Sequence, residues 1–304
     1  MTTRVAYLGP AGTFTEEALL RFAAAGAFGG DEVEAVPVTS PADALDKVRT
    51  GDVARAVVAI ENSVDGAVTG TYDALVDDHG GVQIYHELEL PISFSIMVRP
   101  GMDPADVTSI ASHPIGHQQV RHWLAANLPN AEFIPASSNA AAAEMVARGT
   151  VDAAAAPGRA AALFGLEEIA RGVADMDQAC TRFVVVGKKG APTPRTGNDT
   201  TLVAFTLPNQ PGSLVAALQD FAQRGIDMSR IASRPQSGQY GRYLFYVDLV
   251  GHIDDAVIGD ALRWLWMRSE DILFLGSWPA TRSTEVVAEA EAWVEAARTG
   301  KDTA

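Results

Sequence analysis

The chain has 304 residues, 47% of them hydrophobic, and this length leads us to expect about two domains. Its 23 Lys and Arg are outnumbered by 38 Asp and Glu, and the net charge of −15 argues against binding to nucleic acid or to an anionic membrane surface. A single cysteine excludes an internal disulfide and a cysteine-rich metal site. With no apolar run long enough to span a membrane, the sequence predicts a cytoplasmic protein.

In residues 1–188, short apolar runs alternate with alanine-rich helical patterns, which is typical of parallel strands joined by helices. We expect strands at Val5–Leu8, Val33–Val38, Ala56–Ile60, Val107–Ser112, Ala131–Ala136, Val151–Ala155 and Arg182–Gly187. Capping residues and glycines predict helices at Glu17–Ala25, Ala42–Arg49, Ile115–Asn127 and Ala140–Arg148. The stretch Val82–Arg99 is expected to be extended, which suggests that the chain crosses there between two α/β lobes.

Residues 189–200 are rich in Gly, Pro, Asn and Thr and are predicted to form a linker. The expected elements of residues 201–279 are Thr201–Leu207 (strand), Gly212–Arg224 (helix), Ile226–Ser233 and Arg242–Val250 (strands), Asp254–Arg268 (helix) and Asp271–Ser277 (strand). This β-α-β-β-α-β order predicts a ferredoxin-like fold, with a hairpin turn at Gln236–Gly241. Residues 280–304 are expected to form a C-terminal helix, Glu285–Arg298, and a polar tail.

Four loops that follow expected strands carry small polar residues. They are Gly9–Thr15, Glu61–Gly66, Ser112–Gly116 and Ser137–Asn139. Loops at the carboxyl ends of parallel strands line ligand crevices in open α/β sheets, and the free N–H groups of helix N-termini favour anions. Helix capping alone would explain any one of these loops, but four together predict a cleft for a small carboxylate.

Three other patterns do not indicate a site. Gly9–Gly12 lacks the lysine of a phosphate loop and the spacing of a dinucleotide-binding motif. His113 and His117 are four residues apart, but the sequence shows no third zinc ligand. Cys180 has no recognisable basic partner, so burial as a small apolar side chain is the simpler interpretation.

The segment Asp175–Val186, DMDQACTRFVVV, is the most informative part of the chain. As an extended strand it places Thr181 and Phe183 on one face and Arg182 on the other. Its Thr-Arg-Phe pattern, the opening YLGPAGTFTEEAL and the segment IENSVDGAVTGTYDAL resemble the prephenate dehydratase family.

In the second region, NQPGSL at Asn209–Leu214 and ASRP at Ala232–Pro235 resemble the phenylalanine-binding motifs of ACT regulatory domains. At two positions of these motifs, Ser213 and Ala232, this sequence departs from the residue that is usual in the family. The resemblance implies an α/β protein with a two-lobed, periplasmic-binding-protein-like (type II) catalytic domain in residues 1–188 and a ferredoxin-like ACT domain in residues 201–279.

The resemblance also implies an activity, the conversion of prephenate into phenylpyruvate, carbon dioxide and water, with no metal or organic cofactor. Arogenate dehydratase, which acts on the aminated analogue, is one alternative. A non-catalytic amino-acid sensor is another, although the intact Thr-Arg-Phe segment argues against it.

What this reaction needs chemically suggests roles for individual residues. Thr181 matches the family's essential threonine and is expected to donate a hydrogen bond to the departing hydroxyl group, while Glu61 is a candidate proton donor if burial favours its protonated form. Phe183 is expected to form an apolar wall, and Arg182 to orient the site through an ion pair. The remaining expected substrate-binding residues, which offer donors to the two carboxylates, are Thr13, Asn62, Ser63, Ser138 and Asn139.

Binding of the effector L-Phe is expected at Gly212, Ser213, Leu214, Val215, Ser233, Arg234 and Pro235. Gly212 permits a close approach of the backbone, and the helix that follows it offers its N-terminus to a carboxylate. Because the family places phenylalanine between two ACT domains, the resemblance implies a homodimer or homotetramer joined through them.

Overall fold

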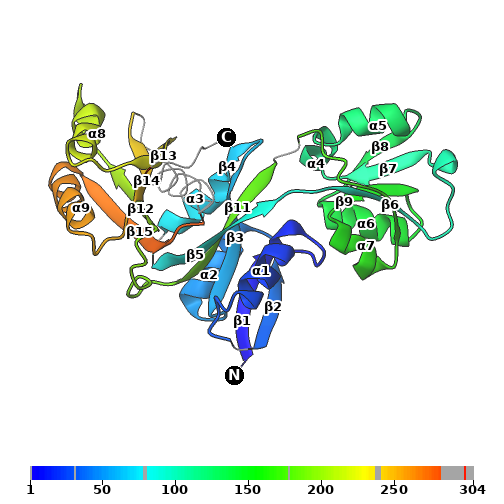
Figure 1. The fold of residues 1–304 in the computed structure, drawn as a ribbon, viewed down its shortest axis with the longest axis horizontal. Coiled ribbons are helices and arrows are strands. Elements are labelled where there is room, and N and C mark those ends of the chain that lie inside the picture. Colours follow the sequence, from blue (N-terminus) through cyan, green and yellow to red (C-terminus); the bar gives the residue numbers. More distant parts are fainter. Residues whose placement is uncertain are drawn as a thin grey trace.

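The computed structural model of the protein describes residues 2–30, 32–77, 81–176, 179–236, 241–281 and 298. It shows three units in a row, with an α/β lobe in the middle, a second lobe at one end and a ferredoxin-like domain at the other (Figure 1). The expected helix Glu285–Arg298, apart from its last residue, and most of the turn Gln236–Gly241 lie outside the described residues.

The first lobe is built around a twisted sheet in the order β2-β1-β3-β11-β5, with the short β4 beside β3. These strands are β1 (Thr2–Leu8), β2 (Glu32–Val38), β3 (Arg55–Asn62), β4 (Gly66–Ala67), β5 (Val82–Pro91) and β11 (Cys180–Lys188). Strands β1, β2 and β3 are parallel, whereas β11 is antiparallel to both of its neighbours. The helices are α1 (Phe14–Ala24), α2 (Pro41–Thr50) and α3 (Thr69–Val76).

The second lobe repeats this plan in a sheet of order β8-β7-β9-β6-β10. Its strands are β6 (Ser95–Val98), β7 (Ser109–Ser112), β8 (Glu132–Pro135), β9 (Ala153–Ala156) and β10 (Glu167–Arg171), and its α-helices are α4 (Pro114–Gln118), α5 (Arg121–Asn127), α6 (Asn139–Ala147) and α7 (Gly158–Phe164). In each lobe, the strand that enters from the other lobe is antiparallel to both of its neighbours. This strand is β11, between β3 and β5, in the first lobe, and β6, between β9 and β10, in the second. The expected type II periplasmic-binding-protein-like fold is therefore confirmed.

The chain crosses between the lobes twice, after β5 and before β11. The two crossing segments run side by side, since the Ile92 N–H donates to the Ala179 carbonyl at 2.7 Å and Thr181 is paired with Leu90. Thr181 thus lies at the start of β11, next to both crossings. This position places the Thr-Arg-Phe segment at the junction of the lobes.

The expected single helix Ile115–Asn127 is instead two helices, α4 and α5. Between them Val120 leaves the helical region, with φ −126° and ψ 7°. The carboxylate of Asp175 accepts the His122 N–H at 3.2 Å and so caps the start of α5. Because this cap lies 53 residues further along the chain, no local pattern signals the break.

The ferredoxin-like domain has the expected element order and an antiparallel sheet in the order β13-β14-β12-β15. Its elements are β12 (Asp199–Thr206), α8 (Ser213–Gln223), β13 (Met228–Pro235), β14 (Tyr243–Val250), α9 (Ala256–Arg268) and β15 (Asp271–Pro279). This part of the fold prediction is confirmed as well.

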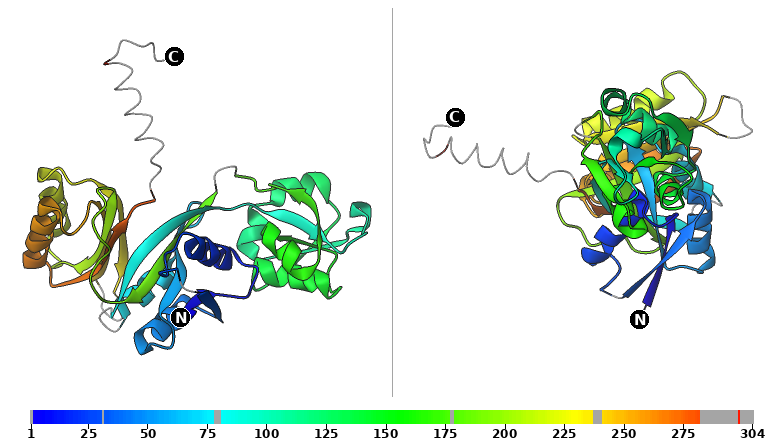
Figure 2. Two further views of the ribbon diagram at one scale, coloured as in Figure 1. Left: turned by 60° about the horizontal axis from the view of Figure 1, so that its bottom comes forward. Right: turned by 90° about the vertical axis from the view of Figure 1, so that its right-hand side faces the viewer.

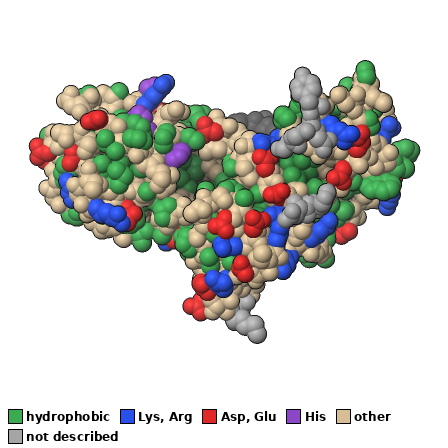
Figure 3. Space-filling view, turned by 180° about the vertical axis from the view of Figure 1, so that it is seen from behind, with side chains coloured by type: hydrophobic (Ala, Val, Ile, Leu, Met, Phe, Trp, Pro, Cys, Tyr) green, Lys and Arg blue, Asp and Glu red, His purple; other side chains and the backbone are tan. Residues whose placement is uncertain are grey.

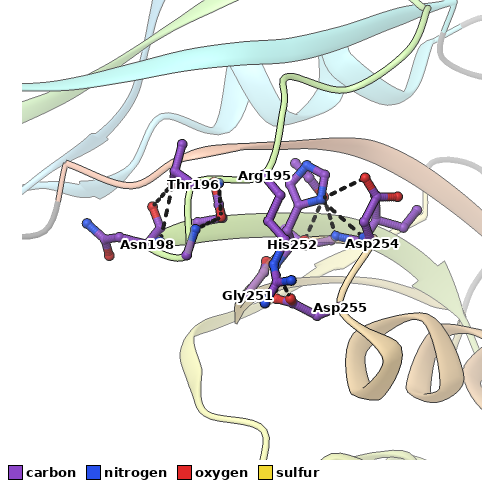
Figure 4. Close-up of polar contacts among 12 residues, drawn as sticks. Arg195, Thr196, Asn198, Gly251, His252, Asp254 and Asp255 are labelled. Atoms are coloured by element: carbon purple, nitrogen blue, oxygen red, sulfur yellow. Dashed lines mark hydrogen bonds and ion pairs between the residues drawn. The ribbon is translucent and has the colours of Figure 1, made fainter.

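Residues 189–198 have no regular structure, but they are fixed to the ferredoxin-like domain (Figure 4). His252 is fully buried, and its Nδ1 accepts the Asp254 N–H at 3.1 Å, so its Nε2 donates to the Thr193 carbonyl at 2.9 Å. Arg195 forms an ion pair with Asp255 at 2.6 Å. The segment is therefore packed against this domain instead of forming a loose tether.

The first lobe and the ferredoxin-like domain share one hydrophobic core, and Figure 2 shows the two units in close contact. Buried side chains from both units meet in it, among them Val58, Val184, Leu202, Tyr246 and Trp278. Gly276 allows β15 to approach β5, because a Cβ there would lie 2.5 Å from the Ile84 carbonyl oxygen. None of the helices that the structure describes combines the length and the apolar composition of a membrane span.

Candidate active site

Thr181 lies in the cleft between the lobes. Its side chain is buried, with the residue 6% exposed, and it borders a cavity of about 340 Å³. The walls come from both lobes and are formed by Phe14, Asn62, Asp65, Gly66, Ala67, Val68, Ile92, Phe94, His113, Ile115, Gly116, Gln119, Asn139 and Thr181. The cavity therefore combines the start of β11 with residues of α4 and α6.

The orientation of the Asn62 side chain determines what Thr181 can do. Asn62 Oδ1 accepts two backbone N–H groups, from Val64 at 2.8 Å and Asp65 at 3.3 Å. The amide nitrogen must then face Thr181, and it donates to Thr181 Oγ1 at 3.1 Å. Thr181 Oγ1 is the acceptor of this hydrogen bond, so the proton of the Thr181 hydroxyl remains available to a group in the cavity.

A second cavity of about 690 Å³ continues the cleft, with Phe14, His113 and Asn139 bordering both. The helices α1 of the first lobe and α6 of the second both begin at this larger cavity, where Thr13 and Ser138 are the N-caps. In Figure 3, histidine side chains lie on the second lobe close to the hollow that separates it from the first. Two helix N-termini facing one cavity make it suitable for an anion.

The hydroxyls of Thr13 and Ser138 differ in whether their proton is available to a ligand. Thr13 Oγ1 accepts the Glu16 N–H and donates to the Leu8 carbonyl, so its hydroxyl proton is already used within the protein. Ser138 Oγ accepts the Ala141 N–H, and its own proton has no partner among the described residues. Of these two expected substrate-binding residues, Ser138 is the one that still has a donor.

Asn139 connects the two cavities from the start of α6. Its Oδ1 accepts from the His113 N–H at 3.0 Å and the Ser112 hydroxyl at 3.1 Å, which turns its amide nitrogen away from them. Gly116 makes this packing possible, because a Cβ there would lie 2.5 Å from Asn139 Oδ1 and 2.8 Å from Ser112 Oγ. Gly116 lies in one of the four loops expected to line the cleft, but its close contact with Asn139 could not be predicted from the sequence.

The apolar wall beside Thr181 differs from the expected one. Phe183 is 2% exposed in the core and does not border either cavity, although it shares the face of Thr181. Phe14 and Phe94 line the smaller cavity, with their rings edge to face at 5.5 Å between centroids. Sequence reasoning did not identify them, because one follows a helix cap and the other lies in a crossing segment.

Glu61 and Arg182 point to the opposite face of the sheet from Thr181. Their paired positions place them together, and Arg182 Nη1 lies 3.8 Å from Glu61 Oε2. Arg182 also donates to Glu87 at 2.8 Å and Asp248 at 2.7 Å. Burial opposes its charge, but these two carboxylates outweigh that effect and raise the pKa of Arg182. The structure thus does not bring Glu61 or Arg182 to the cavity.

Ser63 and Cys180 brace the start of β11 instead of lining a cavity. The Ser63 hydroxyl accepts the Cys180 N–H at 2.9 Å, and the Ser63 N–H donates to the Cys180 carbonyl at 2.9 Å. Burial, followed by the charge of Glu89, raises the pKa of the Cys180 thiol, which disfavours a nucleophilic thiolate.

The residues expected to bind L-Phe lie at one end of the ferredoxin-like domain. Gly212 has a φ of 86° and precedes α8, whose first turn contains Ser213, Leu214 and the exposed Val215. Ser233, Arg234 and Pro235 end β13, and Arg234 pairs with Asp73 of the first lobe at 2.6 Å. Pro235 pairs with Tyr243 at the start of β14, and Thr206, which ends the strand before Gly212, pairs with the next residue of β14, Leu244.

His113 and His117 have separate structural roles. His113 Nδ1 accepts the Ile115 N–H at 3.3 Å, whereas the His117 ring stacks on Phe133 with 3.8 Å between centroids. In the described part of the chain, no cluster of three His, Cys, Asp or Glu side chains could hold a metal ion.

Comparison with known proteins identifies the family. The model of the prephenate dehydratase family matches residues 5–191, and the ACT domain model matches residues 201–263. The chain belongs to the prephenate dehydratase family. The prephenate dehydratase of Corynebacterium glutamicum is 54% identical over 98% of both chains, and that of Mycobacterium tuberculosis is 49% identical over 98% of this chain and 95% of its own.

Solved structures agree with this family. A prephenate dehydratase from Arthrobacter aurescens, in complex with L-Phe, has 36% identity and a TM-score of 0.83, covering 97% of this chain and 99% of its own. A protein described as a novel type of quorum quenching acylase has 29% identity and a TM-score of 0.79, covering 92% of this chain and 98% of its own. The expected family is confirmed, with the ferredoxin-like unit as its ACT domain.

Proposed function

We propose that the protein converts prephenate into phenylpyruvate, carbon dioxide and water at the cleft between its lobes. The observation that carries this proposal is the Asn62–Thr181 pair, which holds a threonine hydroxyl as a free donor at the cavity between the lobes. Family membership supplies the substrate class. We also propose that the reaction takes place in the cytoplasm.

Thr181 serves the departure of the ring hydroxyl. Hydroxide is a poor leaving group, and a hydrogen bond that strengthens as the C–O bond breaks lowers the barrier. The Asn62 amide can donate to Thr181 but cannot accept its proton, so the pair lacks the general base that a threonine nucleophile would need. Glu61 lies on the other face of the sheet, so it is not the donor of the proton that the departing hydroxide takes up.

The two carboxylates of prephenate need donors, and the helix ends supply them. Among the described residues that line the two cavities there is no Lys or Arg. The N-termini of α1 and α6, the Ser138 hydroxyl and the Asn139 amide therefore hold the anions. Since these helices belong to different lobes, one dianion draws the lobes together.

Loss of carbon dioxide is assisted by the apolar side of the smaller cavity. Phe14, Ile92 and Phe94 lie there with Thr181. A carboxylate against such a surface loses hydration, whereas neutral carbon dioxide does not need it. The electrons of the breaking C–C bond enter the ring as the C–O bond breaks, and the ring becomes aromatic.

Variants at Thr181 test this proposal through the appearance of phenylpyruvate. Thr181→Ser keeps a hydroxyl and should retain much of kcat, whereas Thr181→Val should lower kcat by about 10²-fold or more. Thr71→Val is the matched control, because it removes a hydroxyl that donates to the Ala59 carbonyl on β3, away from the cavities. A Thr181→Val protein with the kcat of the wild type would refute the role of Thr181.

We propose that L-Phe regulates this activity by binding at the end of the ACT domain formed by Gly212–Val215 and Ser233–Pro235. The N-terminus of α8, an 11-residue helix, suits the amino-acid carboxylate, and the φ of 86° at Gly212 leaves the backbone open to approach. Calorimetric titration with L-Phe tests the site. Absence of heat at millimolar concentration would exclude it.

The same domain supports assembly as a homodimer or homotetramer. Strand β13 is at the edge of the ACT sheet, and every second residue along it is exposed, including Ile231 at 45%. An unpaired edge of this kind is a template for a strand of a second chain. The mass of the protein in solution, measured by light scattering, tests this assembly, and a monomer would exclude it.

Arogenate is the alternative substrate. It differs from prephenate at the side chain, where an amino group replaces the keto group. The values of kcat/KM for the two acids, measured side by side, decide between them. A larger value for arogenate would replace prephenate as the substrate and leave the role of Thr181 unchanged.

A further inference from the structure

A buried cluster of charges joins the strand that carries Thr181 to the ACT domain. Arg182, the next residue of β11, donates to Glu87 on β5 at 2.8 Å and to Asp248 on β14 at 2.7 Å. The side chains of Glu87 and Asp248 are 5% and 1% exposed. Charges enclosed in this way restrain one another, because removing one partner leaves the other buried and uncompensated.

The ACT domain has no direct contact with the active-site cavities. It lies at the opposite end of the first lobe from the second lobe (Figure 1), and none of its described residues lines either cavity. A change in the ACT domain must therefore cross the first lobe to reach Thr181. One direct route runs from Asp248 to Arg182, which is joined to Thr181 by a single peptide bond.

Asp248 lies on the strand pair that also carries part of the proposed L-Phe site. Strand β14 pairs with β13, so that Arg230 is opposite Asp248 and Ser233 is opposite Phe245. Arg230 Nε comes within 3.7 Å of Asp248 Oδ1, but that oxygen has no hydrogen-bond partner among the described residues. A shift of β13 along β14 would change this contact first.

We propose that Asp248 is a positioning residue for Thr181, acting through Arg182, and that ligand binding at the ACT domain reaches the reaction by this pair. The proposal rests on the proposed function, because its effect is measured on prephenate turnover. Arg182 and Thr181 point to opposite faces of β11, so a rotation that follows Asp248 on one face turns the hydroxyl on the other.

The test compares Asp248→Asn with Asp220→Asn in the full-length protein. Asp220 is a matched control, because its ion pair with Arg268, at 2.6 Å, lies within the ACT domain. One measurement is the steady-state kinetics with and without L-Phe. The other is hydrogen exchange of the peptides that cover β11, read by mass spectrometry.

Asp248→Asn is expected to lower kcat about three- to tenfold with KM within about twofold, to weaken the response to L-Phe, and to speed exchange in β11. Asp220→Asn should leave all of these unchanged. A wild-type kcat with wild-type β11 exchange would overturn the proposal, as would faster exchange spread evenly over the ACT domain.

The two proposals fail in different ways. If the wild type does not convert prephenate, the proposed function fails, and exchange in β11 still decides the role of Asp248. If Asp248→Asn does not fold, Arg182→Lys is measured instead, since a lysine keeps the charge but cannot bridge Glu87 and Asp248. Wild-type kcat and β11 exchange in that variant would also overturn the positioning role.

Discussion

Replacing Asn62 with aspartate should abolish the donor function of Thr181 while keeping the backbone hydrogen bonds that residue 62 accepts. The new carboxylate still accepts the N–H groups of Val64 and Asp65, which Asn62 Oδ1 now accepts at 2.8 and 3.3 Å. Its second oxygen replaces the amide nitrogen that donates to Thr181 Oγ1 at 3.1 Å, and a carboxylate oxygen can only accept. The Thr181 hydroxyl then donates to residue 62 instead of to the substrate.

The size of the effect follows from this single exchange. Loss of one preorganised donor to a leaving oxygen lowers kcat by about 10²- to 10³-fold. Both backbone hydrogen bonds survive, so the free energy of unfolding should change by no more than about 1 kcal/mol. The added negative charge at the cavity also repels a dianionic substrate, so KM should rise.

A double-mutant cycle separates these two effects, with phenylpyruvate formation as the assay. In a Thr181→Val background, Asn62→Asp should leave kcat unchanged, because no hydroxyl remains to be redirected, but should still raise KM. A single Asn62→Asp variant that keeps kcat within about threefold of the wild type contradicts the reasoning. So would additive losses of kcat in the cycle.

Two further predictions concern the second lobe and the pH dependence of stability. Gly116→Ala should lower kcat/KM at least about tenfold and the free energy of unfolding by about 1–3 kcal/mol, because the new Cβ collides with Asn139. Steady-state kinetics and urea unfolding check this, and unchanged values of both would be inconsistent with the packing. For His86, burial and then the charge of Arg55 lower the pKa, so the unfolded chain binds a proton first. The contribution of neutral His86 to stability is then fully present above about pH 6.5 and is lost as the pH falls below this value. A plot of melting temperature against pH should therefore be flatter below about pH 6.5 for His86→Gln than for the wild type. A variant with the same slope as the wild type would exclude His86 as its source.

The fold was largely predictable because its signals are local. Short apolar runs marked the central strands, and capping residues marked α1, α2 and α6, although the expected starts Glu17, Ala42 and Ala140 lie one to three residues late. Helices α3 and α7 were missed because neither has a side-chain cap. Strand β10 was missed because it is short and lies at a sheet edge, where EEIAR shows little alternation.

The site was predictable only in part. Strand alternation correctly separated Thr181 from Arg182, and the same rule, applied to neighbouring Glu61 and Asn62, would have placed Glu61 away from Thr181. The cap of α5 by Asp175 and the aromatic wall formed by Phe14 and Phe94 depend on contacts between distant segments. Such contacts leave no trace in a local pattern.

The position of Thr181 beside the two crossing segments has a consequence for how the cleft can open. In a rotation of one lobe about these segments, displacement grows with distance from the axis. The outer rim therefore swings widely while the partners Thr181 and Asn62, which belong to the same sheet, stay together. Product can leave through the parted rim at the end of each cycle, and the hydrogen-bonding pair at the pivot remains assembled for the next one.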